Sequence, residues 1–377
     1  MRNWLVSGAF YNGIFLMGPL HGIKVLEFGK ARPGSFAGMM MSDLGADVLR
    51  IEREDAQDPL PQRLDGRGRR SVSLNLKDPV ARELCLDLFR SADLVMEGHR
   101  PGVMERLGLG PTVAVEHNPR LIYGRLTGWG QNGAYAENAG HDINYIALAG
   151  VLRAIGGPSG PVVPLNLVGD AGGSLCFIIG LLAAIINVRI TGKGQVVDAA
   201  MSDSAAYLMS MFYGMTSAGT WREERASNMI DGGAPFYNVY RCADGEWIAI
   251  GAIEPRFYAQ LLDMIGATGL TPEAQLDRSS WAETSMTLGA IFGTRTRQQW
   301  CDILEQEEVC FSPVLSLAEA PSHPHFTSRG TFVDIDGIIQ PAPVPRFSET
   351  PARIQWPPAP ICQDIAEAIE DWRKVRA

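Results

Sequence analysis

The chain has 377 residues, of which 46% are apolar and 20% charged, so its composition is that of a folded globular protein and excludes a disordered or fibrous one. Lys and Arg number 33 against 42 Asp and Glu, and the net charge of −9 argues against nucleic acid or an anionic membrane as the main partner. The six cysteines are scattered without a CxxC pair, which favours reduced thiols in a cytoplasmic protein over a metal site or a disulfide framework.

The N-terminal segment differs from the rest of the chain. Residues 3–20 are uncharged and follow Arg2, as in a secretory signal, but Asn, Gly and Pro interrupt the run and no small-residue cleavage site follows. We therefore expect residues 1–18 to be a non-native or disordered extension, with Met17 as the natural start. A second uncharged apolar run, residues 175–186, is too short to span a bilayer and predicts a buried helix rather than a membrane anchor.

Strands and helices alternate through the first 200 residues. Hydrophobic runs predict strands, and periodic segments between them predict helices, one of which has Pro33 in its first turn. This alternation predicts an α/β fold with a mostly parallel sheet and helices on both faces. The expected strands cover 23–28, 46–51, 93–97, 121–126 and 195–197, and the expected helices cover 33–44, 78–91, 101–107, 111–117, 142–152 and 172–188.

The remainder of the chain changes character. A long helix is expected from about residue 200, followed by a β-hairpin over 237–251 with its turn at Asp244-Gly245. Helices over 255–265 and 297–307 and a strand near 311–316 complete a smaller α+β unit. Seven of the 24 prolines lie between residues 341 and 360 and indicate an extended linker. A final amphipathic helix is expected over 362–375.

A nicotinamide dinucleotide is not expected as a cofactor. The turn after the first strand, residues 29–34, lacks the GxGxxG pattern, and its Pro33 has no N–H to offer a pyrophosphate. We expect neither a cofactor nor a metal.

Basic residues concentrate in one segment of this acidic chain. Between residues 63 and 77 there are five basic residues and only one acidic residue, Asp65. This local excess of positive charge favours a polyphosphorylated small ligand. The alternative is a solvated charged surface that balances the nearby acidic residues Glu54, Asp55 and Asp58. The five basic residues are Arg63, Arg67, Arg69, Arg70 and Lys77.

Three residues that follow loops could act as acids or bases: His141, Asp170 and Glu254. Each also has an ordinary structural role open to it, as a helix cap or a loop residue. The glycines around Asp170, in the segment 169–173, would let a ligand approach the N–H groups of a helix and so stabilise an oxyanion.

Several short sequence motifs, spread from about Pro19 to the C-terminus, resemble those of the family III CoA-transferase (CaiB/BaiF) superfamily. Within this superfamily, the motifs at residues 140–145 and 251–255 are similar to those of the α-methylacyl-CoA racemase branch. The phrases typical of the superfamily are Leu44-Gly45-Ala46-Asp47-Val48, Leu74-Asn75-Leu76-Lys77, Arg100-Pro101-Gly102, Arg106-Leu107-Gly108, Gly130-Gln131-Asn132-Gly133 and Gly192-Lys193-Gly194-Gln195-Val196-Val197-Asp198.

The resemblance implies a fold and a partner. It implies a Rossmann-like large domain over 19–200, completed by 345–377, then a linker helix over 201–236, a small α+β domain over 237–320 and a return linker over 321–344. It also implies an interlocked homodimer, with each active site between the large domain of one chain and the small domain of the other. The resemblance further implies contacts to coenzyme A from Arg53, Arg67, Ser71, Leu74, Arg106, Asp142 and Tyr145.

The implied reaction is inversion at C2 of a 2-methylacyl-CoA thioester through an enolate. His141 and Asp170 would be the two acid/bases, one on each face of the carbon. Glu254 of the partner would orient the His141 imidazole, and N–H groups near Asp142 and Asp170 would bind the enolate oxygen. In the rival activity, CoA transfer, Asp170 would be a nucleophile; such transferases carry a longer glycine-rich loop than Gly232-Gly233 and lack a histidine at 141.

A methionine-rich run follows residue 207. Met209, Met211 and Met215, with neighbouring aromatic residues, are interpreted first as core packing. The alternative is an adaptable apolar surface for the acyl chain of the thioester.

Overall fold

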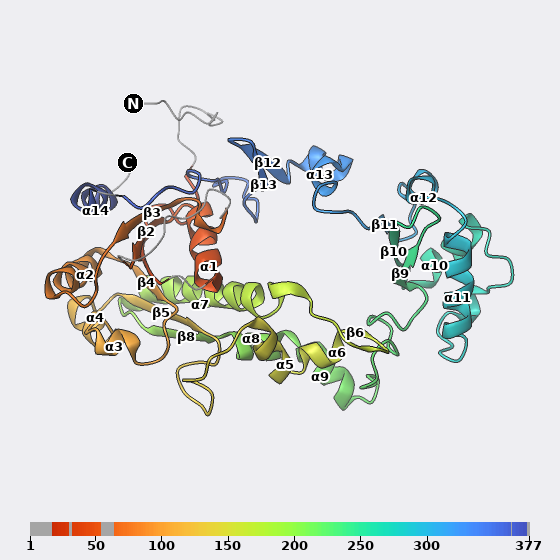
Figure 1. Cartoon of the computed structure of the whole chain (residues 1–377), viewed down its shortest axis with the longest axis horizontal. Coiled ribbons are helices and arrows are strands. Elements are labelled where there is room, and N and C mark those ends of the chain that lie inside the picture. The colour runs from red at the N-terminus through yellow and green to blue at the C-terminus, as the bar shows by residue number, and fades with distance from the viewer. Residues whose placement is uncertain (1–16, 30–31, 54–63, 363, 375–377) are drawn as a thin grey trace. The chain divides into compact units, whose positions relative to one another are not determined.

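A computed structural model describes residues 17–29, 32–53, 64–362 and 364–374 (Figure 1). The expected N-terminal extension and Arg63 lie outside these residues, apart from Met17 and Gly18. The chain divides into two units, which are described separately. Unit 1 comprises Met1–Ala149, Leu165–Leu208 and Gly330–Ala377, and unit 2 comprises Gly150–Pro164 and Met209–Arg329.

Unit 1 is built on a six-stranded sheet in the order β3-β2-β1-β4-β5-β8, in which every neighbouring pair is parallel. This is the Rossmann order, with β8 as the sixth strand. The predicted α/β class with a parallel sheet is therefore confirmed. The strands are β1 (Lys24–Phe28), β2 (Asp47–Glu52), β3 (Arg69–Ser73), β4 (Leu94–Glu97), β5 (Ile122–Thr127) and β8 (Val196–Ala200).

Helices cover both faces of this sheet because its central strands are apolar on both sides. On β1, Leu26 faces one hydrophobic core and Val25 faces the other. The first core packs against α2 (Pro79–Ser91), α3 (Val103–Arg106), α4 (Pro111–His117) and α14 (Ile365–Arg373), and the second against α1 (Arg32–Asp43), α5 (Asp142–Leu148), α7 (Asp170–Thr191) and α8 (Met201–Leu208) (Figure 1).

Strand β3 was not expected from the sequence, because it begins with two arginines. In the structure its outer edge is covered by the C-terminal segment, where Cys362 N–H donates to Ser71 O at 2.8 Å. Helix α14, which follows this C-terminal segment, contains Trp372. The Trp372 side chain is completely buried, and its indole N–H donates to Asp47 O at 2.9 Å. Helix α14, near the C-terminus, therefore belongs to the core of unit 1.

Segment 321–344, expected as a linker, carries regular structure of its own. It contains α13 (Pro324–Arg329) and the hairpin of β12 (Phe332–Ile335) and β13 (Ile338–Pro341). Gln340 of this hairpin is 2% exposed and accepts a hydrogen bond from Arg67 at 2.8 Å. The hairpin is thus part of unit 1 and not a free connection.

Unit 2 has an antiparallel sheet in the order β11-β10-β9. The predicted hairpin is present, and Gly245 in its turn has a φ of +86°, which favours glycine. The helix expected from residue 200 is instead two helices in separate units, α8 and α9 (Ser210–Ser217), and α11 was not expected. The elements of unit 2 are α6 (Val151–Ala154), β6 (Gly156–Gly157), β7 (Gly160–Pro161), α9, β9 (Tyr237–Arg241), β10 (Trp247–Gly251), α10 (Pro255–Met264), α11 (Trp281–Phe292), α12 (Arg297–Leu304), β11 (Phe311–Pro313) and α13.

Candidate functional site

The candidate residues of unit 1 gather at the carboxyl edge of its sheet. Arg53 directly follows β2, His141 follows β5 after a loop, and Asp170 begins α7, the helix that leads into β8. In parallel α/β sheets, ligands bind outside this edge, at the point where the strand order reverses. Here that point lies between β1 and β4.

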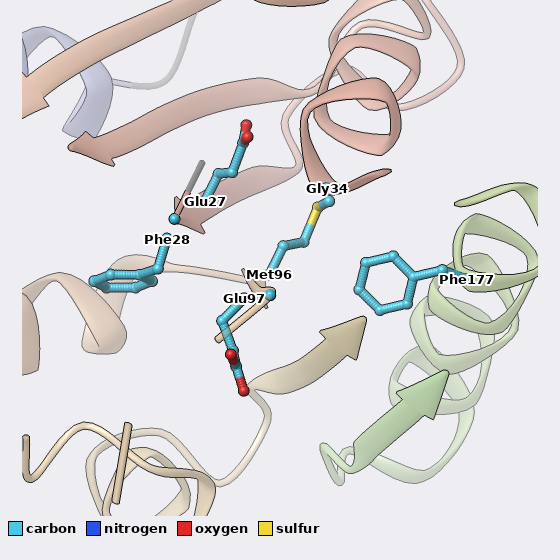
Figure 2. A pocket seen from close by; sticks show the side chains of 8 residues that line it. Glu27, Phe28, Gly34, Met96, Glu97 and Phe177 are labelled. Atoms are coloured by element: carbon cyan, nitrogen blue, oxygen red, sulfur yellow. The ribbon is translucent and has the colours of Figure 1, made fainter. Parts of the chain in front are cut away.

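A small cavity occupies this reversal point (Figure 2). Its volume is about 10 Å³, enough for about one water. Figure 2 shows Glu27 and Phe28 from β1, Met96 and Glu97 from β4, and Phe177 from α7 around it. Phe177 is seven residues from Asp170, or about 10 Å along the helix.

Two carboxylates at the cavity are held by arginines. Glu27 is 2% exposed and accepts from Arg69 Nη1 at 2.8 and 2.9 Å. Glu97 accepts from Arg125 Nε at 2.7 Å, and burial raises the pKa of Glu97 above its usual value. Both side chains are therefore occupied by contacts within the protein.

His99 is a residue that the sequence analysis missed. Its backbone N–H donates to Glu97 at 2.7 Å, while its Nε2 is buried and has no hydrogen-bond partner in the described part of the chain. Burial and the positive charge of Arg53 lower the pKa of His99. The position, two residues after β4, is a signal that could have identified it. A buried ring nitrogen without a hydrogen-bond partner is rare in native proteins and calls for an explanation.

The starts of α5 and α7 meet through one side chain. His141 is the N-cap of α5, and its exposed backbone N–H donates to Asn144 Oδ1 at 3.0 Å. The next residue, Asp142, is 3% exposed and accepts the Asp170 N–H on Oδ2 at 2.7 Å. The Asp170 carboxylate in turn accepts from Asn166 Nδ2 at 2.8 Å. The structure therefore brings the segments of His141 and Asp170 together.

Tyr145 fixes the loop that carries His141. Its hydroxyl donates to Gly140 O at 2.5 Å, and its ring packs edge-on against Trp129, with 4.8 Å between centroids. Burial, and then the charges of Asp170 and Asp142, raise the pKa of Tyr145, so the hydroxyl keeps its proton. The buried ring gives Tyr145 a structural role next to the candidate bases, in addition to the coenzyme contact expected for it.

The arginine-rich segment is not a free cationic surface. Arg67 is 4% exposed and binds Asp43 at 2.6 Å, Gln340 at 2.8 Å and Pro341 O at 2.9 Å. Arg69 binds Glu27, and Arg70 binds Asp47. Because Arg67 precedes β3 and Asp43 ends α1, their contact lies at the amino edge of the sheet, opposite the carboxyl edge. A phosphate contact by Arg67 would require these bonds to break.

The remaining expected coenzyme contacts are placed as follows. Leu74 N–H donates to Glu52 O at 2.9 Å, and Ser71 O accepts from Cys362, so these two backbone groups are already paired. Arg53 and Arg106 are exposed, after β2 and at the end of α3 respectively.

Glu254 lies in unit 2, as the exposed N-cap of α10, three residues after β10 ends. The preceding carbonyls of Ala252 and Ile253 accept from Gln275 Nε2 at 3.0 and 2.8 Å. Gln275 is 3% exposed and was not identified from the sequence, which holds no local signal for this contact. It fixes the loop that presents Glu254.

The methionine-rich helix does not pack in the core, so the first interpretation of this run was wrong. None of the residues of α9 is buried, and Met211 and Tyr213 are 56% and 60% exposed. The alternative, an adaptable apolar surface, agrees with this exposure.

Within the described ranges, one helical stretch, Leu165–Thr191, is long and apolar enough to cross a membrane, and an 18-residue window of it has a mean hydropathy of 2.2. Half of that window is buried inside the protein, and core helices pass the same test. The same ranges contain no group of three His, Cys, Asp or Glu residues that could hold a metal ion.

Residues 20–364 match the model of a family described as CoA-transferase family III. The alpha-methylacyl-CoA racemase of Homo sapiens is 40% identical over 353 residues, 93% of this chain and 92% of that protein. The succinyl-CoA–D-citramalate CoA-transferase of Chloroflexus aurantiacus is 29% identical over 94% of each chain.

Solved structures show the same fold. Rv3272 from M. tuberculosis matches with a TM-score of 0.76 and 28% identity, over 91% of this chain and 96% of that one. A CAIB/BAIF family protein from Brucella suis matches with a TM-score of 0.82 and 24% identity, over 94% of this chain and 100% of that one, and this likeness bears on the fold alone.

Proposed function

Because the chain belongs to CoA-transferase family III, we propose that it is an isomerase that inverts C2 of 2-methylacyl-CoA thioesters. The identity of 40% to the human racemase over 93% of the chain supports an enzyme acting on acyl-CoA. The observation that carries the proposal is the 2.7 Å hydrogen bond between Asp142 and the Asp170 N–H, which joins the segments of the two candidate bases.

The proposed reaction moves one proton off C2 and another onto its opposite face. One base, His141 or Asp170, takes the α-proton while the C–H electron pair moves into the enolate. The other, protonated at the start, delivers its proton from the other side, and their roles exchange with the direction of the reaction. Both transfers use side chains of the chain, so the proposal includes no cofactor.

The enolate oxygen needs hydrogen-bond donors. The Asp170 N–H, one of the donors expected from the sequence, is already bound to Asp142 and is not available. The Asp142 N–H has no acceptor within the described ranges, so it remains the proposed donor to the enolate oxygen.

The coenzyme would follow the carboxyl edge of the sheet. Arg53 and Arg106 are exposed and cationic, and suit the phosphates. The exposed residues of α9 suit the acyl chain, because methionine side chains adapt to chains of different shape. Glu254, contributed by the partner in a dimer, would orient the His141 imidazole.

The proposed enzyme is a homodimer, and the exposed face of α7 supports this. Leu175, Ile179, Ile186 and Ile190 are 44–79% exposed and fall within about 60° of the helix circumference. A helix that is apolar on its outer face as well as its inner one is normally covered.

We expect the purified chain to sediment as a dimer, and Ile179→Glu to shift it towards the monomer because a charge would be buried in the interface. Sedimentation velocity at several concentrations measures this. A monomeric wild-type chain that floats with neutral lipid vesicles would contradict the dimer and favour a membrane contact. The matched control is Glu83→Gln, on an exposed face of α2.

Incubation of the wild-type enzyme in D₂O with one enantiomer of a 2-methylacyl-CoA tests the activity. We expect α-deuterium incorporation together with approach to an equal mixture of enantiomers, because the enolate takes its new proton from an exchangeable base. Transfer of CoA to an added carboxylate, without α-exchange, would contradict the racemase and identify Asp170 as a nucleophile.

A further inference from the structure

The carboxylate of Asp142 has no role in the proton transfers described above, and it occupies an unusual place. It is 3% exposed, and its Oδ2 accepts the Asp170 N–H at 2.7 Å. Its Oδ1 is buried without a hydrogen-bond partner among the described residues. An incompletely satisfied buried carboxylate is costly and calls for an explanation.

The electrostatic environment explains how the charge is tolerated. Asp142 binds the first N–H of α7, a helix of 22 residues. The unpaired N–H groups at a helix start carry partial positive charge and stabilise a carboxylate there. The Asp142 side chain therefore ties the start of α5 to the start of α7.

Gly169 makes this contact sterically possible. A Cβ at Gly169 would lie 2.6 Å from Asp142 Oδ2 and 2.9 Å from its Cγ, well inside van der Waals contact. Gly169 has a φ of −74°, which any residue can adopt, so its backbone conformation does not require glycine. The absence of a side chain at 169 serves the approach of Asp142.

We propose that Asp142 is a positioning residue that sets the separation of His141 and Asp170. It is the chain neighbour of His141 and binds the backbone of Asp170 directly, so one side chain links the two bases. Two bases on opposite faces of one carbon need a fixed separation, and a misplacement of about 1 Å lowers a rate by about 100-fold. This inference rests on the proposed function.

Asp142→Ala is expected to lower the turnover number about 100-fold, because the base is displaced. KM should stay within about threefold, because the variant keeps the backbone N–H of residue 142 and the proposed coenzyme contacts of Arg53 and Arg106. Asp142→Asn keeps an oxygen that can accept the Asp170 N–H and should stay within about fivefold of wild type. Gly169→Ala should resemble Asp142→Ala, since its Cβ pushes the same oxygen away. Asp78→Ala, which removes the N-cap carboxylate of α2, is the control and should leave turnover unchanged.

The ratio of α-deuterium incorporation to inversion separates positioning from general loss of structure. With Asp170 displaced, an enolate formed by His141 is reprotonated from the same face. Exchange without inversion should therefore rise for one enantiomer and not for the other. Unfolding would instead lower both rates together and leave the ratio at the wild-type value.

The double variant Asp142→Ala with Gly169→Ala completes the test. The new Cβ would meet a methyl group in place of a carboxylate, so the double loss should be smaller than the product of the single losses. The inference would be overturned if Asp142→Ala kept the wild-type turnover number and the wild-type ratio of α-deuterium incorporation to inversion. It would also be overturned if the loss of turnover in the double variant equalled the product of the two single losses. If the wild type transfers CoA instead of racemising, the proposed function is wrong; loss in Asp142→Ala with rescue in Asp142→Asn would still support positioning of Asp170.

Discussion

Asp170→Asn is expected to lower the turnover number for racemisation by about 1,000-fold, within the range that general acid–base catalysis supplies. The amide can neither take nor return the α-proton, whereas it can still accept the hydrogen bond from Asn166 that now measures 2.8 Å. KM for the CoA ester should change less than about threefold, because Asp170 acts at C2 and not at the coenzyme. Initial rates of inversion and of α-deuterium incorporation give both the turnover number and KM.

The control for this variant is Asp203→Asn, which makes the same change of charge at an exposed position of α8. It should retain wild-type turnover. Racemisation by Asp170→Asn within tenfold of wild type would show that another group supplies the second base.

Arg67→Ala is expected to destabilise unit 1 by about 3–5 kcal/mol, because it leaves a buried carboxylate, Asp43, without its partner. The guanidinium also holds Gln340 and the carbonyl of Pro341, so the β12–β13 hairpin should open as well. Amide hydrogen exchange, resolved by peptide over β2, β3 and β13, measures the change within unit 1.

Two further variants distinguish structure from coenzyme binding. The double variant Arg67→Met with Asp43→Leu replaces the ion pair by apolar side chains and should recover most of the lost stability. Arg53→Ala should raise KM for the CoA ester about tenfold while changing stability by about 0.5 kcal/mol or less. If Arg67→Ala keeps wild-type protection but raises KM, Arg67 contacts phosphate, as the family resemblance implies.

The arginine-rich segment shows where sequence reasoning stops. Residues 63–77 contain five basic residues and one aspartate, and this count favours a ligand site. In the fold, Arg67, Arg69 and Arg70 meet carboxylates that lie 24, 42 and 23 residues away. A local excess of charge therefore says little about surface potential until the partners are known.

Strand β3 and the methionine-rich helix α9 illustrate the same limit for burial. The strand starts with two arginines, and only the neighbouring carboxylates and the C-terminal cover make it a buried strand. The apolar run around Met211 has the composition of a core helix but packs on no core of its own unit. Periodicity reports which residues share a face, and not what that face meets.

The sequence by itself determined the α/β class, the parallel sheet, the family and the candidate bases His141 and Asp170, because these depend on local alternation and on phrases of a few residues. Only the tertiary structure decided that Asp142 binds the Asp170 N–H and that Arg67 binds Asp43 and Gln340. It also decided that a buried ring nitrogen of His99 has no hydrogen-bond partner among the residues the structure describes. Asp142 and Asp170 are 28 residues apart, and Arg67 and Gln340 are 273 apart. Such contacts follow from packing whole elements against one another, and no local pattern in the chain encodes them.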